Sequence, residues 1–89
     1  MDGKLHLLLT SNFSSLDEST QEEIYKNFYK FVYRIALYVL KDHDEAEDVV
    51  HEAFIKTIYH APPVENERQL RAWIRVVTRN LTLNIQTGQ

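Results

Sequence analysis

Apolar residues recur at three- and four-residue steps in three separate stretches of the chain, which is the period of an amphipathic α-helix. The spacing predicts helices over about residues 19–41, 45–60 and 67–85. The expected buried positions are Ile24, Phe28, Phe31, Val32, Ile35, Val39 and Leu40, then Ala46, Val49, Val50, Ala53, Phe54, Thr57 and Ile58, then Leu70, Trp73, Ile74, Val77 and Leu81. No strand pattern of useful length occurs. We therefore expect an all-α fold, a compact three-helix bundle.

Polar residues that cap helices precede each predicted helix. The expected capping pairs are Ser19 with Glu22, Asp44 with Glu47, and Asn66 with Gln69. Three acids, Glu45, Glu47 and Asp48, would then lie in the first turn of the second helix and complement its dipole. Pro62 and Pro63 should end that helix.

The two ends of the chain are less periodic. Leu5, Leu8 and Leu9 are compatible with a short extra helix docked on the bundle. We accordingly divide the chain into an N-terminal segment at 1–16, a helical domain at 17–86 and a tail at 87–89. The apolar run at Leu5–Leu9 is too short for a signal sequence, and no run could span a bilayer, so we expect a soluble, unexported protein.

Charge is unevenly distributed along the 89 residues. The net charge is −3, but residues 1–60 carry six Lys/Arg against eleven Asp/Glu, whereas residues 61–89 carry four arginines against Glu65 and Glu67. An acidic front and a basic back suggest two partners of opposite charge. The chain has no cysteine, which excludes disulfides, thiolate metal sites and a cysteine nucleophile.

The second predicted helix carries an acidic ridge, composed of Glu45, Asp48 and Glu52 with His51 beside them. Three interpretations compete: a solvated helix face, a metal site on Asp48, His51 and Glu52, or a surface for a basic partner. The metal site is disfavoured because structural sites usually need four ligands, and the offsets of His6, His43 and His60 do not match. No nucleotide-binding or triad motif is present, so we expect no catalysis, metal or cofactor.

The third predicted helix carries an arginine row. Arg71, Arg75 and Arg79 are spaced i, i+4 and i+8, and Arg68 extends the row. This row is either a solvated face or a track for a phosphate backbone. Because Glu65 and Glu67 are expected to precede the helix, no nearby acid would neutralise it, which favours the phosphate interpretation. Trp73 lies on the apolar stripe and should be core rather than a base-stacking platform.

The stretch "YKFVYRIALYVLKDHDEAEDVVHEAFIKTIYH" followed by "LRAWIRVVTRNL" resembles region 2 of bacterial sigma factors of the sigma-70 family, most closely the extracytoplasmic-function group. The resemblance covers about residues 17–84. It implies a transcription initiation factor domain, cytoplasmic and nucleoid-associated, that binds core RNA polymerase and recognises and melts the promoter −10 element.

The same resemblance assigns residues to each partner. The polymerase β′ clamp coiled coil would contact Asp48, His51 and Glu52, with Glu45, Ile55 and Ile58 adjacent. The family usually has glutamine where this chain has His51. A flipped non-template base would enter a pocket rimmed by residues 63–69. The implied DNA contacts are Lys56, Arg68, Arg71, Arg75, Arg79 and Asn80. Primary sigma factors carry two neighbouring tryptophans where this chain has Ala72 and Trp73.

A complete factor of this kind continues into region 4, which reads the −35 element. The present chain ends at Gln89, so the resemblance implies either an excised domain or a stand-alone region 2 protein with a separate region 4 partner. An anti-sigma factor is a further implied partner. Two rival functions stay open: an adaptor that keeps this fold without promoter recognition, and a small metal-dependent enzyme.

Overall fold

The computed structural model describes residues 13–88. Its elements are a 3-10 turn η1 (Phe13–Ser15) and three α-helices, α2 (Glu18–Leu40), α3 (His43–His60) and α4 (Glu67–Gln86). The three helices lie within about two residues of the predicted ranges, and no strand occurs in the described part of the chain. The all-α prediction is confirmed. The helix expected around Leu5, Leu8 and Leu9 lies outside the described residues.

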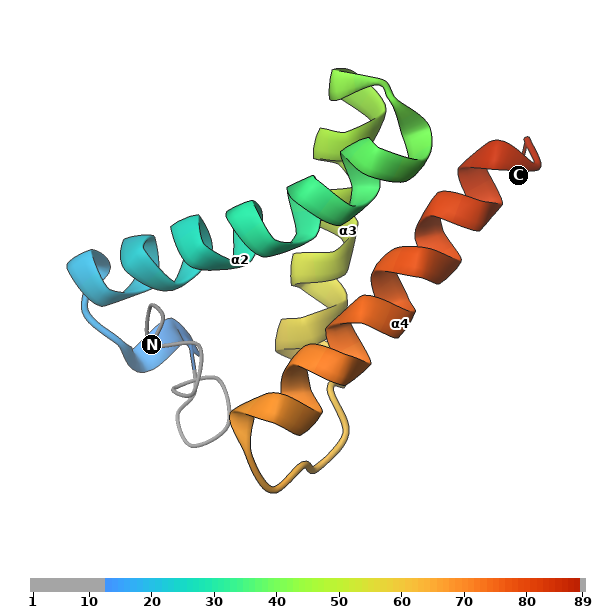
Figure 1. Cartoon of the computed structure of the whole chain (residues 1–89). Helices are drawn as coiled ribbons and strands as arrows, with labels where there is room; N and C mark the ends of the chain where they lie inside the picture. Colours follow the sequence, from blue (N-terminus) through green and yellow to red (C-terminus); the bar gives the residue numbers. More distant parts are fainter. Residues whose placement is uncertain (1–12, 89) are drawn as a thin grey trace.

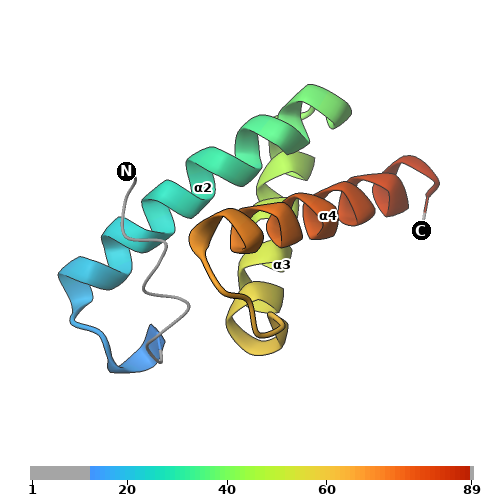
Figure 2. The ribbon, with the colours of Figure 1, turned by 60° about the horizontal axis from the view of Figure 1, so that its bottom comes forward.

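Each helix packs against the other two. A two-residue turn joins α2 to α3, and α3 crosses α2 before the loop at 61–66 returns the chain to α4 (Figure 1). The view turned by 60° shows α4 crossing α3 as well (Figure 2). Because every helix has two helical neighbours, each keeps one outward face for solvent or for a partner.

The core is a row of side chains on each helix. From α2 come Ile24, Phe28, Val32 and Ala36, at four-residue steps and all fully buried. The rows of α3 and α4 contribute Ala46, Val49, Val50, Ala53, Leu70 and Ile74. Burying each larger apolar side chain stabilises the fold by about 1.5–3 kcal/mol. The other expected core residues of α2, such as Phe31 and Ile35, are half-buried at the rim of this row.

Phe54 ties the N-terminal turn to the bundle. Its ring makes edge-on contacts with Phe13, Tyr25 and Phe28, with ring centroids 5.3, 4.9 and 5.0 Å away. The backbone oxygen of Phe13 also accepts a 2.9 Å hydrogen bond from the side chain of Gln21. Packing of this kind, rather than helix propensity, holds η1 against α2 and α3.

Two of the three expected N-caps are wrong. Asp17, not Ser19, caps α2 and accepts from the backbone N–H of Thr20. Asp42, not Asp44, caps α3 and accepts from Glu45 N at 2.9 Å. In each case an earlier capping residue is available, and using it lengthens the helix and its hydrogen-bond ladder.

The earlier start of α3 also changes its first turn. The acids there are Asp44 and Glu45, instead of the expected set that included Glu47 and Asp48. Lys41 makes the turn between α2 and α3 possible. Its φ of 56° lies in the left-handed region, so it caps α2 after Leu40 and directly precedes the N-cap Asp42.

The third N-cap is confirmed. Asn66 accepts from Gln69 N at 2.9 Å and begins α4. The return bond of the capping box differs from the usual pattern, because the Gln69 side chain accepts from the backbone N–H of Glu65, at 2.8 Å, rather than from that of Asn66. This pair of bonds fixes the end of the 61–66 loop against α4.

Threonines replace apolar residues in part of the core. Thr57 was expected to be buried, but Thr78 and Thr82 were missed because they are polar, and both are buried in α4. Thr57 and Thr82 donate to backbone oxygens within their own helices, at 2.8 and 2.7 Å. The Thr78 hydroxyl has no hydrogen-bond partner among residues 13–88, and a buried group left in this state costs stability.

We expect Thr78→Val to stabilise the domain by about 1 kcal/mol, because valine has nearly the same shape and removes the unpaired hydroxyl. Urea unfolding followed by circular dichroism measures the change. Thr57→Val is the matched control, since its hydroxyl is satisfied by the Ala53 carbonyl, and it should give no gain. Equal effects of the two substitutions would contradict this account of Thr78.

Candidate functional site

The acidic ridge is fully formed on α3. Glu45, Asp48, His51 and Glu52 are all exposed, and the three carboxylates make no ion pair with any cation of residues 13–88. Unpaired carboxylates three and four residues apart along one helix face create a local negative potential. The ridge is therefore open to a basic partner.

Apolar side chains border the ridge. Ile55 is 53% exposed on α3, whereas Ile58 is half-buried against the bundle. The sequence did not single out Tyr59, which is 73% exposed at the end of the same helix. Of the two isoleucines that the resemblance put beside the ridge, only Ile55 is thus substantially accessible.

A groove of about 340 Å³ runs between the ridge and the C-terminal half of α4, and we call it the ridge groove. Its lining residues are Asp48, Val49, Glu52, Leu81, Asn84 and Ile85. The acids stand on one side and the apolar residues of α4 on the other. The contribution of α4 was missed from the sequence, because only tertiary packing brings residues 81–85 beside the ridge.

A second hollow, of about 320 Å³, lies between the C-terminal part of α3 and α4, and we call it the α3–α4 hollow. It is lined by Lys56, His60, Trp73, Val77, Asn80, Leu81 and Asn84. Lys56 and Asn80, predicted separately from two helices, therefore meet at one site. Trp73 is half-buried, packs on the core as expected and forms one wall of the hollow. No residue of the 63–69 segment belongs to the lining.

The arginine row lies on a different side of α4. The guanidinium groups of Arg71 and Arg75 lie over the ring of Phe31 on α2, 5.1 and 5.3 Å from its centroid. Arg68 and Arg79, at the two ends of the row, are exposed. The residues expected to bind DNA thus form two groups, with the arginine row toward α2 and Lys56 with Asn80 toward α3.

The expectation that no acid neutralises the row is wrong for Arg71. Glu67 is the first residue of α4, and its Oε2 accepts from Arg71 Nε at 2.9 Å. Both side chains are largely shielded, so this i, i+4 pair is held in place. Arg71 therefore has a structural partner, and the remaining arginines carry most of the available charge.

A hydrogen-bonded network joins α2 to α3 away from these sites. The Tyr29 hydroxyl donates to Glu47 Oε2 at 2.8 Å, and the Tyr33 hydroxyl shares a 2.7 Å hydrogen bond with His43 Nδ1. The two tyrosine rings are stacked, with centroids 5.2 Å apart. His43, Asp44 and Glu47 also place one potential metal-ligand atom each within 4.8 Å of one another. The sequence had singled out Asp48, His51 and Glu52 instead. His43 and Glu47 are already hydrogen-bonded to tyrosines.

The network changes the acid–base behaviour of its tyrosines. The hydrogen bond to Glu47 is the main cause that raises the pKa of Tyr29 to about 12, with burial and the Glu47 charge adding to it. Burial, followed by the Glu47 charge, raises the pKa of Tyr25. The neutral phenol is favoured in both, because a phenolate beside a carboxylate would be repelled.

Residues 24–86 match the sigma-70 region 2 family. The chain belongs to that family. No curated protein and no solved structure is significantly similar to the chain. Sigma-70 region 2 is a domain of transcription initiation factors rather than of a catalytic family, and its role is RNA polymerase binding and promoter recognition. Within residues 13–88, no helix combines the length and the apolar character needed to cross a membrane.

Tyr29→Phe should destabilise the domain at about pH 9 and have less effect as the pH rises through 12. In the unfolded chain the phenol ionises near its ordinary pKa of 10, whereas in the folded chain it stays protonated to about 12. The stability that this group contributes is therefore present below pH 10 and lost by pH 12. Urea unfolding at a series of alkaline pH values measures it, and a constant difference between the two proteins would refute the assignment.

Proposed function

We propose that this chain is the region 2 domain of a bacterial sigma factor of the extracytoplasmic-function group, acting in the cytoplasm. It docks on the β′ clamp coiled coil of core RNA polymerase through α3 and holds the non-template strand of the −10 element at α4. The observation that carries the proposal is the acidic ridge of unpaired carboxylates, in a chain that belongs to the sigma-70 region 2 family.

The docking surface combines charge with apolar anchors. Asp48 and Glu52 supply charge for a basic partner, and Ile55 and the α4 wall of the ridge groove supply apolar area. An interface of this composition gains specificity from the charges and affinity from the buried apolar centre. Glu45 and His51 extend this docking surface, and the half-buried Ile58 packs beneath it.

The DNA surface is proposed at the α3–α4 hollow. Lys56 is a cation for a phosphate, and Asn80 offers an amide for a base edge. The 63–69 segment would rim the site from outside, and Arg68, Arg71, Arg75 and Arg79 would steer or hold the strand. Capturing an unstacked base in such a site favours melting without any chemical step.

Two more partners belong to the proposal. An anti-sigma factor would compete for the acidic ridge, and a separate region 4 domain or protein would recognise the −35 element. The adaptor alternative differs from this proposal in one respect only: it keeps the docking surface and has no promoter recognition.

Binding to an isolated β′ clamp coiled-coil fragment is the test of docking. We expect Asp48→Ala with Glu52→Ala to raise the Kd by at least about tenfold, because two interface charges are lost. Glu18→Ala with Glu22→Ala is the matched control, since these two acids on α2 are also exposed and four residues apart. No binding by the folded wild-type chain would remove the polymerase from the proposal.

Binding to labelled single strands, with and without a −10 sequence, tests the DNA surface separately. Asn80→Ala should reduce the preference for the −10 strand, because an amide reads a base edge. Lys56→Ala should weaken binding to both strands equally and lower the salt dependence by about 0.7 per lost phosphate contact, while Lys56→Arg should preserve it. Tight, sequence-independent binding to duplex DNA by the chain alone would argue against this surface.

A further inference from the structure

The second part of α2 has a composition unlike the rest of this acidic chain. Residues 24–41 contain four cations, Lys26, Lys30, Arg34 and Lys41, and four tyrosines, but no Asp or Glu. All the acids of α2 precede Ile24. Neither the docking surface nor the α3–α4 hollow uses any of these residues.

Three of the four cations share one face of α2, and the fourth, Lys41, is the residue that caps its C-terminus. Lys26, Lys30 and Arg34 follow one another at four-residue steps, about 6 Å apart along the helix axis, and Lys41 lies seven residues farther on. All four are exposed, and none forms an ion pair with an acid of residues 13–88. An evenly spaced row of unneutralised cations is complementary to a regular polyanion.

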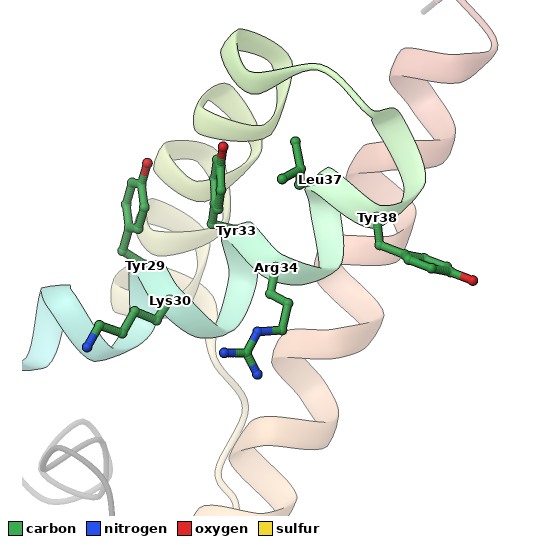
Figure 3. A pocket seen from close by; sticks show the side chains of 6 residues that line it. All are labelled: Tyr29, Lys30, Tyr33, Arg34, Leu37 and Tyr38. Carbon is green, nitrogen blue, oxygen red and sulfur yellow. The ribbon is translucent and has the colours of Figure 1, made fainter.

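An aromatic side chain accompanies the row. Tyr38 is 78% exposed, and the Lys41 ammonium lies 5.0 Å from its ring centroid. Figure 3 shows Tyr38 extending away from α2, and Lys30 and Arg34 pointing in a different direction from Tyr29 and Tyr33. These residues and Leu37 line an open hollow of about 560 Å³. A large, exposed ring beside cations is the arrangement on which an unpaired base stacks.

This face continues toward the arginine row of α4. Arg34 is one helical turn from Phe31, whose ring lies under Arg71 and Arg75. We propose that Lys26, Lys30, Arg34, Tyr38 and Lys41 form a second nucleic-acid surface, which binds the backbone and bases of single-stranded DNA without sequence preference. Single strands are favoured over duplex because only an unpaired base has a free face for Tyr38. The inference goes beyond the proposed function and does not depend on polymerase docking or −10 recognition.

The test uses the whole chain and a labelled oligothymidylate of about twelve nucleotides, which contains no −10 sequence. We expect Lys30→Gln with Arg34→Gln to lower the slope of log affinity against log salt by about 1.4, from two phosphate contacts of about 0.7 each. Lys30→Arg with Arg34→Lys keeps the charges and should keep the slope. Because both side chains are exposed, the fold should be retained in either variant.

Tyr38 is tested at the same site. Tyr38→Ala should weaken oligothymidylate binding by about fivefold to a hundredfold, the contribution of one base stack, whereas Tyr38→Phe should bind like wild type. Unchanged affinity and slope in the Lys30/Arg34 and Tyr38→Ala variants would overturn the inference. So would tighter binding to a duplex of equal length, or displacement of the strand by poly-glutamate at equal charge concentration, which would indicate an acidic protein as the partner. Lys56 and Asn80 are intact throughout, so failure here leaves the −10 surface standing.

Discussion

The contact on which the rest of the structure depends is the row that α2 buries, from Ile24 through Phe28 and Val32 to Ala36. Four-residue steps make this row slant slowly around the helix, so α3 and α4 can both pack along it. The facing residues of α3 include Ala46 and Ala53, whose small side chains allow close approach. Because these faces are buried in the core, the acids of α3 and the cations of α2 lie on the outer faces of their helices.

The net charge of −3 therefore hides surfaces of opposite charge on the same domain. The acids of Glu45, Asp48 and Glu52 lie on α3, while the cations of α2 and the arginine row lie along the α2–α4 side. With a weak overall field we expect little unspecific binding to duplex DNA, while each surface retains its own local potential. Separation of this kind would let one small domain bind a basic protein and an acidic polymer, as proposed, without the two partners competing.

Helix number, helix type and most of the core could be predicted because burial imposes a 3.6-residue period that Ile24, Phe28 and Leu70 report directly. The caps of α2 and α3 could not, because Asp17 and Ser19, like Asp42 and Asp44, are alternatives of similar intrinsic quality. The Glu67–Arg71 pair was missed for a different reason: the start of α4 was predicted correctly, but Glu67 was treated as preceding the helix, although as its first residue it lies one turn before Arg71. The ridge groove and the Tyr29–Glu47 bond join residues distant in sequence, so only packing reveals them.

The two halves of α4 bury different kinds of side chain in the core. Its N-terminal half is anchored by Leu70 and Ile74, whereas the buried residues of its C-terminal half are Thr78 and Thr82. The apolar contacts of the second half come from the half-buried Val77, Leu81 and Ile85, so we expect local opening there to cost less free energy than opening near the 61–66 loop. Leu81 and Ile85, which line the ridge groove, belong to this C-terminal half. A partner bound in the ridge groove would restrict motion of the end of α4. Because α4 also carries the arginine row and one wall of the α3–α4 hollow, binding at the groove would make those two surfaces more rigid.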